Sequence, residues 1–286
     1  MKINFLLFAI IISFISTTTV SAKVVKYFQP PSEKDIPDND FGKMVIHGRN
    51  IFIDTQTYAK PYVGNSLNCV NCHLDAGRLA NSAPLWAAYG VYPAYRVKTK
   101  NVDSIENRMQ GCFMYSMNGK APAAESDEMK SLVVYMYWMS QGAPIGKTLP
   151  GRVYLDLKKP KREVSWDAGE KVYKNNCLIC HGEDGNGQYV NGKTVFPALW
   201  GKNSFNWGAG MHRINTAAGF IKANMPLGQG GKLTDQEAWD VAYYVNSHDR
   251  PKDPRQTGSV EEAKKNLHEE NCSYGKEIHG KKLGTI

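Results

Sequence analysis

The chain has 286 residues, of which 42% are hydrophobic and 22% are charged. This length and composition exclude an intrinsically disordered chain and fit one large domain or two of about 100 to 150 residues. The formal net charge of +8 favours anionic partners, but the basic residues are scattered apart from a cluster at residues 158–162, so we expect no nucleic-acid binding.

Residues 1–22 have the layout of a secretory signal peptide. Lys2 precedes an apolar run at residues 5–15, and polar and small residues follow it up to Ala22. The apolar run is too short to span a bilayer, and no later segment is long and apolar enough to do so. We therefore expect a periplasmic mature protein that starts near Lys23 and has no integral membrane segment. An uncleaved anchor is the alternative.

A C-x-x-C-H motif lies at Cys69, Cys72 and His73. This is the pattern for covalent attachment of haem c. Two thiols about one helical turn apart reach the two vinyl groups of one porphyrin, and the adjoining histidine places its imidazole on the iron. A dithiol redox motif or a zinc site also uses paired cysteines, but neither explains a histidine directly after the second cysteine.

The same motif recurs at Cys177, Cys180 and His181, so the sequence predicts two covalently bound haems c, here called haem 1 and haem 2. The repeat indicates two cytochrome c domains and a mainly α fold. We place them at residues 23–145 and 165–255, joined by a Gly-, Pro- and Lys-containing linker at 146–164 and followed by a tail at 256–286.

Each half also carries two amphipathic segments that predict helices. One precedes each haem motif, at residues 41–52 and 167–176. One closes each half, at residues 126–140 and 234–247. The last of these begins with a capping box formed by Thr234 and Glu237.

Haem 2 needs a second axial ligand from its own domain. Met225 is the best candidate because it is followed by proline well downstream of the motif. Met211, His212 and Lys222 are its rivals.

Haem 1 has no comparable Met-Pro pair. Met109, Met114, Met117 and Cys112 all lie in the right region. A thiolate ligand would lower the iron potential and a thioether would raise it. The residues alone leave this choice open.

The segment NRMQGCFMYSMNGK, residues 107–120, resembles the thiosulfate dehydrogenase family, the TsdA-type diheme cytochromes c that interconvert thiosulfate and tetrathionate. The resemblance continues through YPAYR, YMYWMSQGAPIGK and LPGR into the second domain. It extends from residue 23 to about residue 258.

The resemblance implies roles for individual residues. It makes His73 and Cys112 the axial pair of haem 1, where catalysis takes place, and it places Arg108 and Ser116 in the substrate pocket. Arg96 is a weaker match to a second pocket arginine.

For haem 2, which passes electrons outward, the resemblance implies His181 and Met225 as the axial pair. Some family members carry a lysine directly before this methionine that can replace it as ligand. The neighbour here is Asn224, so we do not expect such a switch.

The implied activity is an oxidoreductase reaction on the small anions thiosulfate and tetrathionate, with a soluble or membrane-attached cytochrome as electron acceptor or donor. Cys112 would act as ligand and nucleophile together. A structural disulfide between Cys112 and Cys272 is the alternative. A diheme electron carrier without a substrate and a Sox-type cytochrome that loads sulfur onto a carrier protein are the competing functions.

Overall fold

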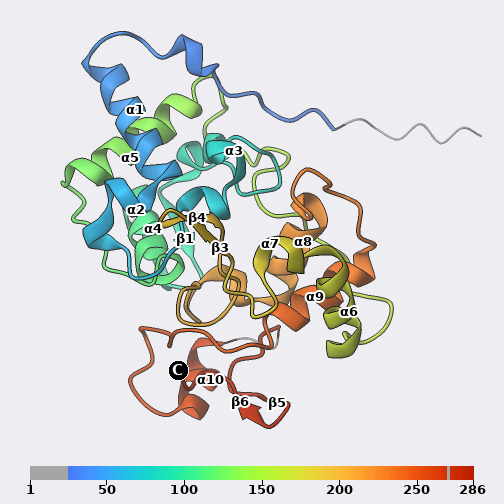
Figure 1. Cartoon of the computed structure of the whole chain (residues 1–286). Helices are drawn as coiled ribbons and strands as arrows, with labels where there is room; N and C mark the ends of the chain where they lie inside the picture. Colours follow the sequence, from blue (N-terminus) through green and yellow to red (C-terminus); the bar gives the residue numbers. More distant parts are fainter. Residues whose placement is uncertain (1–24, 269–270) are drawn as a thin grey trace, which may run out of the picture.

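The computed structural model describes residues 25–268 and 271–286, so the signal peptide expected at residues 1–22 lies outside the described residues. The fold is mainly α, as expected (Figure 1). Its α-helices are α1 (Asp40–Ile53), α2 (Thr55–Tyr58), α3 (Leu74–Gly77), α4 (Ile105–Gly111), α5 (Asp127–Met139), α6 (Trp166–Asn176), α7 (Leu178–His181), α8 (Ile214–Asn224), α9 (Asp235–Val245) and α10 (Val260–Leu267). No helix in the described ranges is long and apolar enough to cross a membrane.

Shorter elements connect these helices. The 3₁₀ turns are η1 (Glu33–Asp35), η2 (Lys60–Tyr62), η3 (Cys69–Asn71), η4 (Leu85–Ala87), η5 (Tyr89–Val91) and η7 (Gly210–His212), and η6 (Cys112–Ser116) is a π-helical turn. The strands form three antiparallel hairpins: β1 (Ala94–Arg96) with β2 (Asn101–Asp103), β3 (Gln188–Val190) with β4 (Lys193–Phe196), and β5 (Glu277–Ile278) with β6 (Lys281–Lys282).

The four helices predicted from amphipathic segments are confirmed as α1, α5, α6 and α9. Polar caps explain where several of them start. The side chain of Ser126 accepts a hydrogen bond from the Met129 amide at the start of α5, and Thr234 and Glu237 form the predicted capping box at the start of α9.

The two halves repeat one packing arrangement, in which the helix before the haem motif crosses the closing helix at a glycine. A Cβ atom added to Gly48 in α1 would lie 2.0 Å from the carbonyl oxygen of Ser131 in α5. A Cβ atom added to Gly169 in α6 would lie 2.2 Å from the carbonyl oxygen of Asp240 in α9. Only glycine allows backbones to approach this closely.

The second half reaches across to the first through the β3–β4 hairpin (Figure 1). The hydroxyl of Thr194 donates to the Ser66 carbonyl at 2.7 Å, and the Lys193 ammonium lies 3.1 Å from the Asp54 carboxylate. The hairpin therefore covers the loop that leads into Cys69.

A buried asparagine, Asn206, makes a further contact between the halves. Three hydrogen bonds hold Asn206 beside η6. Its backbone N–H donates to the Tyr115 carbonyl at 3.1 Å. Its side-chain amide donates to the Met114 carbonyl and to Asn118 Oδ1, both at 2.9 Å. The second half thus holds the turn that carries Cys112.

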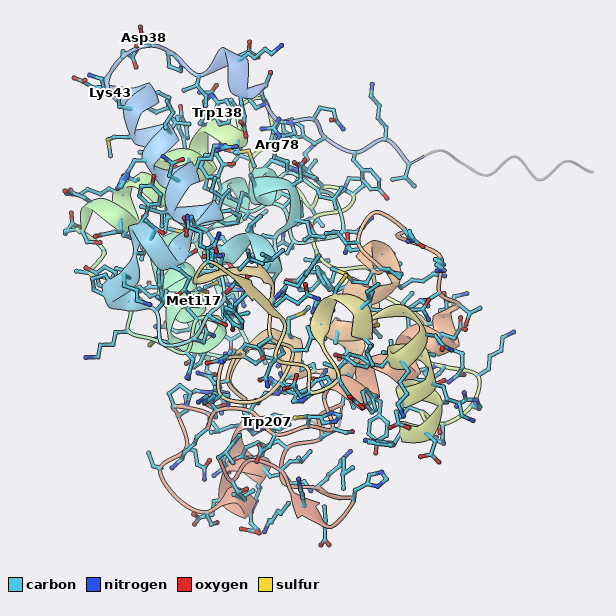
Figure 2. The ribbon with its side chains drawn as sticks, in the orientation of Figure 1. Asp38, Lys43, Arg78, Met117, Trp138 and Trp207 are labelled. Carbon is cyan, nitrogen blue, oxygen red and sulfur yellow. The ribbon has the colours of Figure 1, made fainter. Side chains whose placement is uncertain are left out.

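The described part of the tail, residues 256–268 and 271–286, packs against the second half. Its apolar core contains Trp207, Cys272 and Tyr274, all at most 3% exposed. Figure 2 shows Trp207 where the tail meets the rest of the chain. The indole nitrogen of Trp207 donates to Asp249 Oδ1 at 2.8 Å, and the same oxygen accepts from the Gly284 amide at 2.9 Å.

Candidate functional site

The segment from α4 into η6 positions three of the predicted site residues. Arg108, Cys112 and Ser116 follow one another at intervals of four residues, so they lie on one side of the helical segment. The segment starts at Ser104, whose side chain caps α4. It widens into a π turn at Cys112, where the Met117 amide donates to the Cys112 carbonyl at 3.0 Å. Such π turns occur frequently at functional sites.

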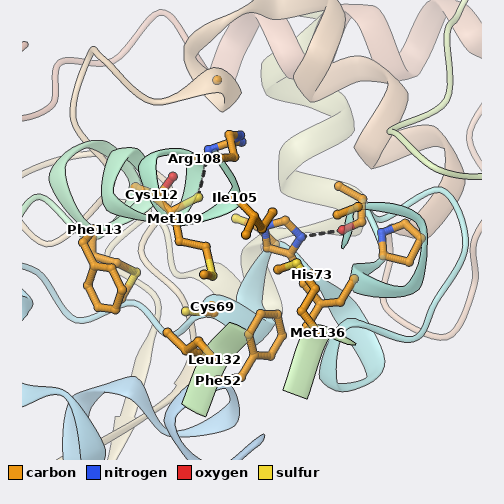
Figure 3. A pocket seen from close by; sticks show the side chains of 18 of the residues that line it. Phe52, Cys69, His73, Ile105, Arg108, Met109, Cys112, Phe113, Leu132 and Met136 are labelled. Atoms are coloured by element: carbon orange, nitrogen blue, oxygen red, sulfur yellow. Dashed lines mark hydrogen bonds between the residues drawn. The ribbon is translucent and has the colours of Figure 1, made fainter. Parts of the chain in front are cut away.

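One cavity in the first half brings together all the residues predicted for the haem 1 site (Figure 3). Apolar side chains that include Phe52, Leu132 and Met136 form much of its remaining wall. The predicted residues that line it are Cys69, Cys72, His73, Arg96, Arg108, Cys112 and Ser116.

These donors fit a haem c. His73 Nδ1 lies 2.7 Å from the Ala83 carbonyl oxygen, so this nitrogen carries the proton and Nε2 keeps a free lone pair. Burial lowers the pKa of His73 to about 4, which keeps the ring neutral. Burial also raises the pKa of Cys69 and of Cys72 to about 12, so both are present as thiols. Two thiols, one neutral imidazole and the additional Cys112 sulfur meet in a largely apolar space.

Arg108 is the direct partner of Cys112. Its Nη1 donates to Cys112 Sγ at 2.9 Å (Figure 3). The attraction between guanidinium and sulfur raises the pKa of Arg108 above its usual value, so this side chain remains a cation. In a cavity with apolar walls such an interaction is stronger than it would be in water.

Two further arginines line the same cavity. Arg96 donates its Nη1 to the Tyr92 hydroxyl at 2.7 Å. Arg152 comes from the segment predicted to be a linker. Three guanidinium groups around one cavity can neutralise an anion with two or more charges.

The methionines weighed as haem 1 ligands separate into two groups. Met109 and Met117 line the cavity, whereas Met114 is not among its lining residues. Met109 and Met117 both lie in the apolar core of the first half. Cys112 differs from these two because its sulfur accepts a hydrogen bond from the half-buried guanidinium of Arg108.

Sequence reasoning missed several residues of the cavity wall. Val153 and Tyr154 lie in the predicted linker, and Gly210 and Met211 belong to the second half. Burial raises the pKa of Tyr154 well above its usual value, so its hydroxyl stays neutral. For this part of the wall, the sequence offered one signal, Arg152 in the LPGR motif, but the motif was matched to the family without a role for this arginine.

Lys98 is a further cation that sequence reasoning missed. Its ammonium lies 3.4 Å from the centre of the Tyr115 ring and donates to the Gly208 carbonyl. Burial lowers the pKa of Lys98 to about 7, and the positive charges of Arg255 and Arg108 contribute in the same direction. Lys98 therefore combines a pKa near neutrality with a position beside Tyr115 of η6.

The second haem motif repeats the local geometry of the first. His181 Nδ1 lies 3.0 Å from the Pro197 carbonyl oxygen, which leaves Nε2 free, and burial lowers the pKa of His181. Burial raises the pKa of Cys177 to about 12. Cys177 packs against an apolar core that includes Trp200 and Tyr244, so the motif Cys177, Cys180 and His181 can hold a second haem c.

The rivals of Met225 have other environments. Met211 lines the haem 1 cavity, and His212 lies in the tail junction beside His268. The Lys222 ammonium pairs with Asp235 at 3.2 Å. Met225 ends α8 and is half-buried. It stays our prediction for the haem 2 ligand.

The alternative disulfide between Cys112 and Cys272 is wrong. Both cysteines are free thiols. Cys112 lines the haem 1 cavity, whereas Cys272 is buried in the tail core.

Comparisons with known proteins agree with this description. Residues 55–145 match the family "SoxA/TsdA, cytochrome c domain", and residues 164–245 match "Cytochrome C oxidase, cbb3-type, subunit III". These matches confirm two cytochrome c domains.

Known thiosulfate dehydrogenases align with most of this chain. A thiosulfate dehydrogenase of Stutzerimonas stutzeri (strain A1501) is 56% identical over 261 residues, which are 90% of this chain and 85% of the relative. A thiosulfate dehydrogenase of Thiomonas intermedia (strain K12) is 54% identical, over 91% of this chain and 83% of the relative. The solved thiosulfate dehydrogenase TsdBA of Marichromatium purpuratum is 45% identical with a TM-score of 0.89, over 91% of this chain and 57% of that longer chain.

Proposed function

Because this chain belongs to the thiosulfate dehydrogenase family, whose cytochrome c domain is shared with SoxA, we propose that it joins two thiosulfate ions into tetrathionate and releases two electrons. We include the reverse reaction, reduction of tetrathionate, because both directions make and break the same sulfur-sulfur bond. The observation that carries the proposal is the 2.9 Å contact between Arg108 and Cys112 in the cavity of the first haem motif.

The proposed ligands combine the two C-x-x-C-H motifs with the family resemblance. Cys69 and Cys72 would attach haem 1, and His73 and Cys112 would bind its iron. Cys177 and Cys180 would attach haem 2, and His181 and Met225 would bind its iron. When bound, the haems supply the one-electron redox capacity that takes up the two electrons.

Cys112 acts as the nucleophile in the proposed reaction. Its thiolate forms a bond with the terminal sulfur of the first thiosulfate, and two electrons leave, which produces a Cys112 S-thiosulfonate. The terminal sulfur of the second thiosulfate then attacks the sulfur next to Sγ. Tetrathionate forms, and Cys112 leaves as a thiolate again.

Arg108 supports both steps. Its contact with Sγ stabilises the thiolate that attacks first and departs last. Its other nitrogens can donate to a sulfonate, as can Arg96 and the hydroxyl of Ser116, which line the same cavity. These cations offset the repulsion between two dianions that must come into contact.

The proposals for the electron partner and the location rest on the sequence rather than on the cavity. We propose that a soluble or membrane-attached cytochrome exchanges electrons through haem 2. We also propose that residues 1–22 direct export and that the mature protein acts in the periplasm.

The proposal is tested with the purified, haem-loaded chain. We expect thiosulfate alone to reduce an artificial one-electron acceptor and to produce one tetrathionate for every two thiosulfates. A reduced dye should in turn consume tetrathionate. A plain electron carrier would do neither, and a Sox-type cytochrome would need a carrier protein before thiosulfate was consumed.

A further inference from the structure

We propose that His212, His268 and Cys272 bind a transition-metal ion, zinc in particular, where the tail joins the second cytochrome domain. One nitrogen of each histidine and the cysteine sulfur all lie within 4.8 Å of one another. These residues are distant in sequence from both haem motifs and take no part in the proposed thiosulfate chemistry.

One pair of donors has a spacing suited to tetrahedral coordination. Cys272 Sγ lies 3.7 Å from His268 Nδ1. Zinc binds sulfur at about 2.3 Å and nitrogen at about 2.0 to 2.1 Å, so two such ligands at the tetrahedral angle are about 3.6 Å apart. An ion can therefore be accommodated between these two atoms with little movement.

The other nitrogen of each histidine lies near an oxygen atom, which is a hydrogen-bond partner for His212 but not for His268. His212 Nδ1 contacts the Ala209 carbonyl, which leaves Nε2 as the donor. His268 Nε2 lies 3.5 Å from Asp253 Oδ2, and Arg255 in turn holds this carboxylate at 2.6 Å. Metal-binding histidines commonly have such a carbonyl or carboxylate on the nitrogen that does not bind the metal.

The cluster is shielded from solvent. His212 and Cys272 are 4% and 3% exposed, and the His268 side chain is 1% exposed. His212 Nε2 is buried and has no hydrogen-bond partner among the described residues. Without an ion, Cys272 and His268 can form a hydrogen bond with each other, but His212 Nε2 stays unpaired, which costs free energy. A bound ion would remove this cost.

Aromatic and backbone contacts hold the donors in place. The ring of His268 stacks on Tyr274, with centres 3.9 Å apart and planes 14° from parallel. The Tyr274 amide donates to Cys272 Sγ at 3.3 Å, which fixes the position of the sulfur. Rings and sulfur held in this way are pre-organised for a metal.

Zinc suits these donors better than copper. Imidazole and thiolate bind both metals, but copper sites with two histidines and one cysteine add a distant axial methionine. The methionine next to the cluster is Met211, and it lines the haem 1 cavity instead. Three protein ligands leave one zinc position for a small ligand such as water.

The ion would stabilise the part of the cavity wall that Gly210 and Met211 form. His212 directly follows Gly210 and Met211, which line that cavity. Cys272 pairs through its backbone with Arg213 on the other side of His212. Metal binding therefore ties the tail to the segment that presents Met211 to the first domain.

The test is the metal content of the purified holoprotein, with haem iron as the internal reference. We expect one zinc per chain. X-ray absorption at the zinc edge, which haem iron does not obscure, should show one sulfur at about 2.3 Å and nitrogens at about 2.0 to 2.1 Å. His268→Gln and Cys272→Ser should lose the zinc, and Asp253→Asn should weaken zinc binding about 10- to 100-fold. His47→Gln, in α1, is the matched control and should keep it.

A measurement on the wild-type chain keeps the test independent of misfolded variants. A strong chelator should remove zinc while both haems stay attached, the tail should become sensitive to protease, and added zinc should restore protection. A chain that contains no zinc and takes up neither zinc nor copper would overturn the proposal. Copper at the same ligands would overturn the assignment to zinc, and zinc retained in both ligand variants would place the ion elsewhere.

Discussion

The guanidinium of Arg108 donates to the sulfur of Cys112 at 2.9 Å, from one turn earlier on the same helical segment. A cation therefore accompanies the thiol before any substrate arrives. The sulfur also lines the cavity of the first haem motif. This contact joins the proposed nucleophile to a stabilising charge beside the proposed redox centre, and several predictions rest on it.

Replacement of the nucleophile should abolish turnover. In Cys112→Ser the hydroxyl is a poor nucleophile at neutral pH and cannot form the S-thiosulfonate. We expect both haems to remain attached, the haem 1 spectrum to change and thiosulfate oxidation to fall to background. Met114→Leu changes the same turn outside the cavity and should keep its activity. Wild-type rates in Cys112→Ser would refute covalent catalysis by this residue.

Loss of the cation should weaken transition-state binding without unfolding the chain. For Arg108→Gln we expect kcat/KM for thiosulfate to fall about 10- to 150-fold, which corresponds to about 1.5 to 3 kcal/mol for a hydrogen bond to a charged group. Arg49→Gln removes an arginine that pairs with Glu33 in the first domain outside the cavity, and it should change little. An unchanged constant in Arg108→Gln would mean that thiosulfate binds elsewhere.

The charge of Lys98 should make thiosulfate binding pH-dependent. Because burial lowers its pKa to about 7, Lys98 is a cation at pH 6 and mostly neutral at pH 8. We expect KM for the dianion to rise as the pH increases through 7. Lys98→Arg should have a flat profile with low KM, since arginine stays charged. Lys98→Gln should have a flat profile with high KM, and a retained pH step would assign the effect to another group.

The proposed ligand of haem 2 should control electron exit without affecting substrate binding. Met225→His replaces a thioether by a harder donor, so the haem 2 potential should fall. The sulfur-to-iron charge-transfer band of the ferric haem should disappear, while KM for thiosulfate stays the same. Met44→His, at a more exposed position of α1, is the control. A band that survives in Met225→His would show that another residue is the ligand.

Because α1 and α5 pack closely at Gly48, a larger residue at this position should lower the free energy of unfolding. The Cβ atom of Gly48→Ala would lie 2.0 Å from the Ser131 carbonyl oxygen, so α1 and α5 would have to separate. We expect urea unfolding to show a loss of about 1 to 3 kcal/mol. Gly90→Ala would meet its nearest neighbours at 3.5 Å and should change the free energy of unfolding by less than about 0.5 kcal/mol. Equal losses in both variants would contradict this account of the helix crossing.

The sequence by itself determined the features that depend on neighbours along the chain. The spacing within C-x-x-C-H predicts covalent haem attachment because both thiols and the imidazole belong to one short segment. The helices around the motifs were predictable because caps such as Thr234 with Glu237, and the apolar faces behind them, repeat at helical intervals. The interval of four between Arg108 and Cys112 likewise places both side chains on one face.

Only the tertiary structure decided which distant segments share a site. Tyr154 of the predicted linker and Met211 of the second domain line the cavity of the first motif, although neither has a local signal for it. His212 and Cys272 were separate alternatives in the sequence, as a haem ligand and a disulfide partner, and they lie in one buried cluster instead. Such contacts arise because packing between the domains and the tail buries apolar surface, and this surface is not encoded in the periodicity of any single segment.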